Sequence, residues 1–164
     1  GARSNLTPMD LQNQRIVIVD DDPNFAALLR YELSMNGYLR VEYFQDPDAF
    51  LQTLADPPAL VLLDYQFDDR TGLELMREVR TSHPDVHVMM LTAYGDVSNA
   101  VASLKEGAFD FIEKGQEAFP KIMESLTRLQ QLELAIHGTK ANGKRSVFGL
   151  FSWVPLLGVL GGSQ

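Results

Sequence analysis

The sequence predicts an α/β fold in which a five-stranded parallel sheet is covered by helices on both faces. Five short apolar runs alternate with five longer amphipathic segments, which is the pattern of repeated strand–helix units. Right-handed crossovers between parallel strands then place helices on both faces of the sheet. In addition, several of the apolar runs end in polar residues, which parallel strands bring to the edge of the sheet where ligands bind.

The apolar runs differ in a way that indicates their place in the sheet. The expected strands are residues 15–20, 39–44, 59–64, 86–91 and 108–112. The first, third and fourth are almost entirely apolar, as is typical of central strands that are buried on both sides. The second, Leu-Arg-Val-Glu-Tyr-Phe, alternates between apolar and polar residues, which favours an edge position.

The segments between and after these strands are expected to be helices, because proline and glycine mark several of their ends. Proline is favourable in the first turn of a helix, and Pro23 and Pro47 open the first two segments. Glycine commonly ends a helix, and Gly37 and Gly107 follow the first and fourth segments. The expected helices are about residues 23–36, 47–56, 72–82, 96–106 and 116–137.

All five units are expected in one domain, residues 15–137. Residues 1–14 form a polar N-terminal tail without the apolar region of a signal peptide. Residues 138–164 are predicted to be a linker and an apolar C-terminal tail. The longest apolar stretch, 147–160, is shorter than the ~20 residues that a membrane-spanning helix needs. These features predict a cytoplasmic protein without a membrane span.

The composition excludes several kinds of site. The chain has no cysteine, so it forms neither a disulfide nor a thiolate metal site, and its three histidines lack zinc-binding spacing. Residues 16–133 carry 21 acidic against 9 basic residues. Such a domain repels phosphate backbones, which argues against direct nucleic-acid binding by this domain. The same charge fits a bound cation or a basic partner.

Three carboxylates are expected to converge at one edge of the sheet. Asp20 and Asp21 directly follow the first expected strand, and Asp64 ends the third. Carboxylates at close range repel one another strongly unless a cation lies between them. Oxygen ligands without cysteine or histidine favour Mg²⁺. The alternative is that residues 20–22 only form a solvated turn and a helix cap, a role that suits Asp22.

Two further polar residues are expected beside these acids. Thr92 follows the fourth strand, and Lys114 follows the fifth. An aspartate nucleophile such as Asp64 forms an acyl phosphate. The transferred group carries negative charge on three oxygens, which a hydroxyl and an ammonium group are suited to stabilise. The set therefore indicates phosphoryl transfer.

Four sequence motifs resemble those of the receiver domains of two-component response regulators, the CheY-like superfamily. They are Ile-Val-Ile-Val-Asp-Asp-Asp-Pro-Asn-Phe (16–25), Leu-Val-Leu-Leu-Asp-Tyr (60–65) with Thr-Gly-Leu-Glu-Leu (71–75), Met-Leu-Thr-Ala-Tyr-Gly-Asp (90–96) and Lys-Glu-Gly-Ala-Phe-Asp-Phe-Ile-Glu-Lys (105–114). The resemblance covers about residues 15–135. It implies a flavodoxin-like (βα)5 fold with strand order 2-1-3-4-5. The last motif is similar to receivers of transcriptional regulators.

The resemblance implies a role for each acidic residue. Asp64 corresponds to the residue that accepts a phosphoryl group from a histidine kinase or a phosphotransfer protein. Asp20 and Asp21 correspond to the acidic pair, with Asp21 the direct ligand of Mg²⁺. The backbone carbonyl of Gln66 is implied to complete the metal site. No enzymatic activity is implied beyond the domain's own phosphorylation and dephosphorylation.

The resemblance also implies a switch. Thr92 corresponds to the switch hydroxyl, Lys114 to the lysine of the site, and Phe111 to an aromatic side chain that rotates. An ordinary strand aromatic is the alternative interpretation of Phe111. Phosphorylation is expected to change the face formed by the fourth helix, the fifth strand and the fifth helix, and to promote a homodimer through that face.

Two features depart from the pattern of the family. Lys114 is followed by Gly115, where receivers usually carry a proline after a cis bond. A trans bond is expected here, since a cis bond before a residue other than proline costs roughly 2.5–4 kcal/mol. The loop of residues 66–70 is also more acidic than the usual Met-Pro-rich loop.

Two alternative functions stay open at this point. Haloacid-dehalogenase-type phosphatases also carry Asp-x-Asp after a strand, a spacing that residues 20–22 contain, but that interpretation leaves Asp64 without a role. The other alternative is a receiver-shaped binding scaffold that never accepts phosphate. Labelling by a small phosphodonor with Mg²⁺, lost on Asp64→Asn, distinguishes a receiver from such a scaffold. Turnover of a phosphomonoester that survives Asp64→Asn supports the phosphatase.

Overall fold

The computed structural model describes residues 10–141 of the chain. These residues belong to two compact units, of which the first is formed by residues 11–126. The second includes Asp10 and residues 127–141. Helix α5 (Ala118–Ala141) begins in the first unit and continues in the second. The apolar stretch 147–160 and most of the expected N-terminal tail lie outside the described residues.

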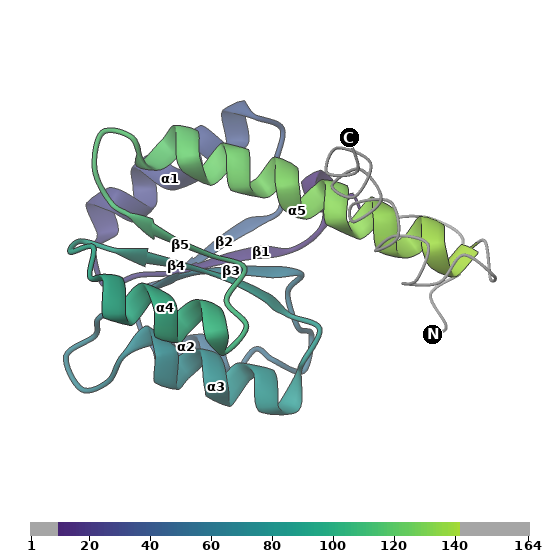
Figure 1. Ribbon diagram of the computed structural model, residues 1–164. Helices are drawn as coiled ribbons and strands as arrows, with labels where there is room; N and C mark the ends of the chain where they lie inside the picture. The colour runs from purple at the N-terminus through teal and green to yellow at the C-terminus, as the bar shows by residue number, and fades with distance from the viewer. Residues whose placement is uncertain (1–9, 142–164) are drawn as a thin grey trace, which may run out of the picture. The chain divides into compact units, whose positions relative to one another are not determined.

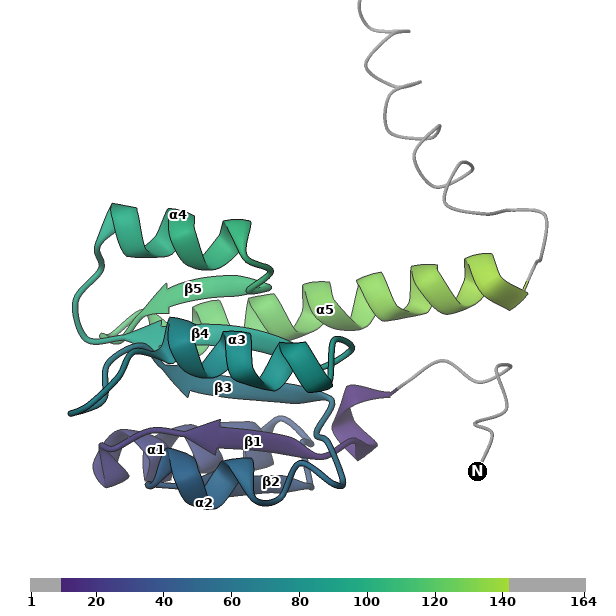
Figure 2. The same ribbon diagram turned by 90° about the horizontal axis from the view of Figure 1, so that it is seen from below.

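The first unit is built on one sheet of five parallel strands. Their order is β2-β1-β3-β4-β5, which confirms the fold class and the strand order expected from the sequence. The strands are β1 (Ile16–Val19), β2 (Val41–Phe44), β3 (Leu60–Asp64), β4 (His87–Thr92) and β5 (Asp110–Glu113). Every residue of β1 and β3 is buried, as their apolar sequences predict. The order from β2 to β5 can be followed in Figure 2.

Helices cover both faces of this sheet. Helix α1 and the first turns of α5 lie on one face, and α2, α3 and α4 lie on the other (Figure 1). The helices before α5 are α1 (Pro23–Met35), α2 (Pro47–Leu51), α3 (Gly72–Ser82) and α4 (Val97–Lys105), and a short 3₁₀ helix η1 (Leu11–Asn13) precedes β1. None of the helices within residues 10–141 is long and apolar enough to span a lipid bilayer.

Each of the helices α1 to α4 starts at a side chain that accepts hydrogen bonds from the first backbone N–H groups. The capping residues are Asp22, Asp46, Thr71 and Asp96. Thr71 and Glu74 form a reciprocal capping box. Because three of these caps lie in the loops that follow β1, β3 and β4, they also fix the path of the chain next to the strand ends.

Helix α2 is shorter than the sequence indicates. It was expected to reach about residue 56, but it ends at Leu51. The turns that follow are closed by backbone hydrogen bonds to the carbonyl three residues earlier, as in a 3₁₀ helix. Thr53 N–H donates to the Phe50 carbonyl, and Asp56 N–H donates to the Thr53 carbonyl. The Thr53 hydroxyl donates to the Phe50 carbonyl and accepts from the buried Arg15 guanidinium, at 2.8 and 3.0 Å. These bonds tighten the chain after Leu51, and a local helix pattern does not reveal them.

The packing of the central strands fixes where the polar residues after them lie. Val19 and Leu63, the apolar residues next to the acids, are 0% and 2% exposed. Val19 pairs with Leu63, and Asp64 pairs with Leu91 of β4. The residues that follow β1, β3 and β4 therefore emerge side by side at one edge of the sheet.

Candidate functional site

The acidic residues that follow β1 and end β3 form one cluster. Carboxylate oxygens of Asp20, Asp21 and Asp64 all lie within 4.8 Å of one another. Asp20 is 0% and Asp64 5% exposed, whereas Asp21 is exposed to solvent. The cluster thus has a buried floor and an open side. Within residues 10–141, this is the one place where three or more acidic or histidine side chains lie close enough together to hold a metal ion.

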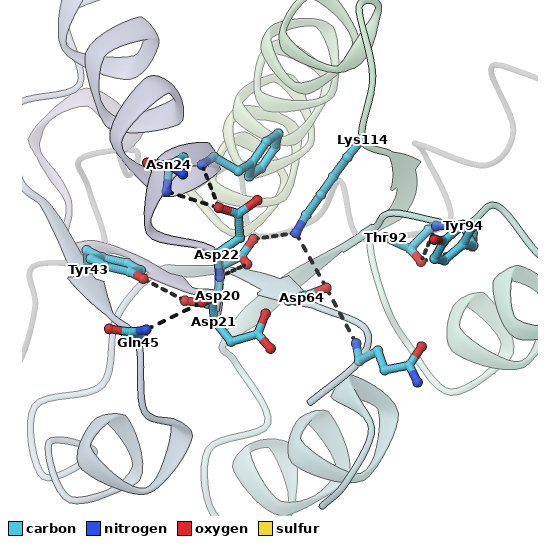
Figure 3. A network of polar contacts seen from close by, with 12 residues as sticks. Asp20, Asp21, Asp22, Asn24, Tyr43, Gln45, Asp64, Thr92, Tyr94 and Lys114 are labelled. Carbon is cyan, nitrogen blue, oxygen red and sulfur yellow. Dashed lines mark hydrogen bonds and ion pairs between the residues drawn. The ribbon is translucent and has the colours of Figure 1, made fainter. Parts of the chain in front are cut away.

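Lys114, directly after β5, lies against this cluster (Figure 3). Its Nζ is 2.8 Å from Asp20 Oδ2 and 3.6 Å from Asp64 Oδ1. Its side chain is 12% exposed. The backbone N–H of Lys114 donates to the Thr92 carbonyl at 2.7 Å, which extends the pairing of β5 with β4 beyond the last strand residue. The ammonium group therefore offsets part of the negative charge of the two buried carboxylates.

The loop that carries Asp20 and Asp21 is held by hydrogen bonds. The backbone N–H of Asp22 donates to Asp20 Oδ1 at 2.8 Å. Asp22 itself caps α1, because its carboxylate accepts from the N–H groups of Asn24 and Phe25. The helix-cap alternative thus describes Asp22, while Asp20 and Asp21 belong to the cluster.

Tyr43, a residue that sequence reasoning did not single out, supports the same loop. Its hydroxyl donates to the Asp20 carbonyl at 2.8 Å. Tyr43 lies on β2 and pairs with Ile18 of β1, so the parallel register brings its side chain beside the end of β1. The expected strand order already placed β2 beside β1, so a polar side chain near the end of β2 was the signal that could have identified Tyr43.

The environment of Asp64 raises the pKa of its carboxyl group from 3.8 to about 7. Burial is the largest cause, since it disfavours the charged form, and the negative charge of Asp20 adds to it. The Lys114 ammonium and the backbone N–H of Gln66, 3.4 Å from Asp64 Oδ1, lower the pKa and oppose these effects. Without a cation, ionising the Asp64 carboxyl group in the folded protein therefore costs more free energy than ionising it in the unfolded chain.

This cost predicts a pH dependence of stability. Without Mg²⁺, the free energy of unfolding of the wild type is expected to fall, relative to Asp64→Asn, as the pH rises from about 4 to about 7. In that range the folded state keeps a proton on Asp64 that the unfolded state has lost, so raising the pH favours unfolding. We expect a difference of about 2 kcal/mol, since water on the open side of the cluster screens part of the repulsion.

Urea unfolding of both proteins across this pH range measures the difference. Saturating Mg²⁺ is expected to reduce it, because a cation offsets the repulsion. Parallel pH profiles of the two proteins would contradict the prediction.

Thr92 ends β4 close to the cluster, but its hydroxyl group is engaged elsewhere. It donates to the Tyr94 carbonyl at 2.9 Å and accepts from the Tyr94 N–H at 3.2 Å. In Figure 3 the Thr92 side chain lies to one side of the acids, next to Tyr94. The structure thus groups Asp20, Asp21 and Asp64, places the Lys114 ammonium group against Asp20 and Asp64, and leaves the hydroxyl of Thr92 bonded within its own loop.

The other two expected site residues lie at the margin of the cluster. Gln66 is exposed, and its position is fixed by a bridge to Thr71 across the loop. Phe111 is half-buried on β5, with its ring in an edge contact with Tyr65, centroids 5.7 Å apart. The roles of both residues, like those of the other site residues, stay predictions. The Lys114–Gly115 bond is trans, as expected, since no peptide bond in residues 10–141 is cis.

The donor set of the cluster fits Mg²⁺. Three carboxylates and no nitrogen or sulfur ligand are what a hard divalent cation prefers. On the side of Asp21, which is exposed, the cluster is open to solvent. Chemically, the arrangement places the Asp64 carboxylate, a group of the kind that can act as a nucleophile, beside an ammonium group and two further carboxylates.

Comparisons with known proteins agree with this geometry. Residues 16–127 match the family described as response regulator receiver domain. The nitrogen assimilation regulatory protein NtrX of Azorhizobium caulinodans is 35% identical over 121 residues, which cover 73% of this chain and 27% of that protein. The response regulator MprA of Mycobacterium ulcerans is 38% identical over 122 residues, which cover 73% of this chain and 52% of that protein. The chain thus spans about a quarter to about half of the length of these curated relatives.

Solved structures show the same fold. A CheY-like receiver domain protein from Methanospirillum hungatei JF-1 superposes with a TM-score of 0.67 at 27% identity, covering 74% of this chain and 97% of that one. The response regulator TrrA of Thermotoga maritima, solved in complex with Mg²⁺-BeF, gives a TM-score of 0.63 at 29% identity, covering 71% of this chain and 98% of that one. From its sequence match over residues 16–127 and its five-stranded fold, the chain belongs to the family of response regulator receiver domains.

Proposed function

We propose that this domain is a phosphorylation-dependent signalling receiver in which Asp64 accepts a phosphoryl group in the presence of Mg²⁺. The donor is a histidine kinase or a phosphotransfer protein. The observation that carries the proposal is the cluster itself, with three carboxylates within 4.8 Å and the Lys114 ammonium 3.6 Å from Asp64 Oδ1. We place this action in the cytoplasm, with no direct nucleic-acid binding by the domain.

Asp64 acts as the nucleophile. One of its carboxylate oxygens forms a bond to phosphorus as the bond between phosphorus and the histidine nitrogen of the donor breaks. When bound by Asp20, Asp21, Asp64 and the carbonyl of Gln66, Mg²⁺ supplies positive charge that offsets the charge of the phosphoryl oxygens. Lys114 supplies a second positive charge from the other side of the cluster.

Phosphorylation then acts through Thr92 and Phe111. We propose that the Thr92 hydroxyl leaves the Tyr94 carbonyl and donates to a phosphoryl oxygen, since a charged acceptor gives the stronger hydrogen bond. This exchange changes the loop between β4 and α4. Phe111 leaves its edge contact with Tyr65 as that loop moves. The two changes together alter the face formed by α4, β5 and α5.

Phosphorylation is expected to shift the protein from monomer to homodimer through this face. Val97, Val101 and Leu104 of α4 are 80%, 44% and 47% exposed and recur at the spacing of one helix face. Exposed apolar residues grouped in this way favour an interaction surface. Sedimentation with and without beryllofluoride and Mg²⁺ measures the shift, and Val101→Glu is expected to prevent it. An unchanged monomer in the presence of the phosphoryl mimic would count against the dimer.

The test of the function itself is labelling by a small phosphodonor such as acetyl phosphate. Incubation with Mg²⁺ is expected to add one phosphoryl group to the chain, and peptide mapping is expected to place it on Asp64. Chelation of the metal is expected to prevent the addition. A wild-type protein that takes up no phosphoryl group under these conditions supports the scaffold alternative instead.

The phosphatase alternative draws no support from the structure. In that interpretation Asp22 serves as the second acid of Asp-x-Asp, but the Asp22 carboxylate accepts from the N–H groups of Asn24 and Phe25 at 3.0 and 3.2 Å. We therefore propose no enzymatic activity beyond the phosphorylation and dephosphorylation of the domain itself.

A further inference from the structure

Two aromatic side chains from different helices meet next to Lys114. Phe25 lies in the first turn of α1, and Phe119 lies in the first turn of α5. Their rings are stacked, with centroids 5.7 Å apart and an interplanar angle of 13°. The Nζ of Lys114 lies over the Phe25 ring, 4.7 Å from its centroid. The ammonium group is thus in contact with the aromatic ring and with Asp20 and Asp64 at the same time.

Apart from the Phe25 ring and the two carboxylates, the groups around Lys114 do little to fix the position of its ammonium group. A lysine side chain is long and flexible, and ordering it costs conformational entropy. The residue after it, Gly115, is exposed, and a methyl group added there would meet no atom within 4 Å. The hydrogen bond from Lys114 N–H to the Thr92 carbonyl orders the backbone only. The two carboxylates attract the ammonium group, but both are the groups that phosphorylation and metal binding change.

A ring face provides an attraction that does not depend on those carboxylates. A cation over an aromatic ring is attracted by the negative face of the ring, most strongly where water is excluded. The Lys114 side chain is only 12% exposed, so this condition is met. The attraction also has no fixed bond direction, so the ammonium group can shift from Asp20 toward a phosphoryl oxygen while it stays over the ring.

We propose that Phe25, held in place by its stacking on Phe119, is a positioning residue that keeps the Lys114 ammonium group aimed at Asp64. The effect on phosphorylation rests on the function proposed above. The position of the ammonium group does not rest on that function, and a separate experiment measures it.

Nuclear magnetic resonance of the full chain tests the position directly. Protons near an aromatic ring face resonate upfield, so the ε-methylene protons of Lys114 are expected to lie upfield of those of exposed lysines such as Lys121. Phe25→Leu keeps an apolar side chain but removes the ring, and it is expected to return these signals to ordinary positions. Phe119→Leu is expected to move them part of the way. Signals that Phe25→Leu leaves unchanged would overturn the proposal.

The rate of labelling by acetyl phosphate at saturating Mg²⁺ tests the consequence. Phe25→Leu is expected to slow labelling roughly three- to tenfold, the range that loss of a partly desolvated cation–π contact allows. Phe25→Tyr keeps the ring and is expected to label at close to the wild-type rate. Because tyrosine also keeps the volume of the side chain, the upfield position of the Lys114 protons, and not the rate, separates the ring contact from a space-filling role. Tyr31→Leu is the matched control, since it removes an exposed aromatic residue from the same helix.

The outcomes separate the two proposals. Equal rates for wild type and Phe25→Leu would overturn the role of Phe25 and leave the function of Asp64 intact. A wild type that is not labelled at all would overturn the proposed function, and the Lys114 signals then decide the positioning alone. Thermal unfolding of each variant identifies any that is misfolded, and the comparison of Phe25→Leu with Phe25→Tyr then rests on folded proteins.

Discussion

Replacing Asp64 by asparagine is expected to abolish phosphoryl labelling of the domain by acetyl phosphate. Asparagine has almost the same shape as aspartate, but its amide does not attack phosphorus to form an acyl phosphate. The loss is expected to exceed about 10³-fold, given what removal of a covalent nucleophile costs in enzymes that use one. Mass measurement of the intact protein, after incubation with Mg²⁺ and the donor, gives the labelled fraction.

The matched control for this variant is Asp68→Asn. Asp68 is exposed in the loop that follows Asp64, so it has the same chemistry close by without a place in the cluster. Its replacement is expected to leave labelling intact. The Asp64→Asn protein is expected to be folded and, above pH 7, more stable than the wild type, because it removes a buried carboxyl group whose pKa is raised to about 7. Labelling that survives in Asp64→Asn and is lost in Asp68→Asn would refute the assignment of Asp64.

Replacing Gly72 by alanine is expected to destabilise the fold by about 3 kcal/mol, because the added methyl group has no space. Gly72 is the first residue of α3, and its N–H donates to the Tyr65 carbonyl. A Cβ at this position overlaps the Asp64 carbonyl oxygen and lies 3.0 Å from the Tyr65 Cα. Both are backbone atoms at the strand end that carries Asp64, so neither is able to move aside as the end of a flexible side chain does.

Gly115→Ala is the matched control for Gly72→Ala. A Cβ at Gly115 meets nothing within 4 Å, so the change is expected to stay within about 0.5 kcal/mol of the wild type. The midpoint of urea unfolding compares the two variants. We also expect Gly72→Ala to be labelled more slowly by acetyl phosphate, since relief of the overlap displaces Asp64. Equal stability of the two variants would show that the approach between α3 and the end of β3 is not tight.

The sequence predicted the location of most secondary structure because the signals for it are local. The buried runs of β1, β3 and β4 are almost wholly apolar, and Pro23, Pro47 and Gly37 mark the ends of helices. The end of α2 was predicted wrongly because it depends on a contact across the sheet: the Thr53 hydroxyl accepts from Arg15, which lies 38 residues earlier. No local pattern contains that information.

The fold class and the residue types that meet at the edge of the sheet follow from the amino-acid sequence. A parallel sheet of βα units has little choice about where its strand ends lie, so Asp20, Asp21 and Asp64 had to converge. The arrangement of the side chains at this edge does not follow from the sequence pattern and depends on how the chain packs. The raised pKa of Asp64, the turn of the Thr92 hydroxyl toward Tyr94 and the place of Lys114 over Phe25 depend on burial and on distances between residues remote in the chain. Energies of this kind change over a few ångströms, which is a finer scale than a pattern of residue types resolves.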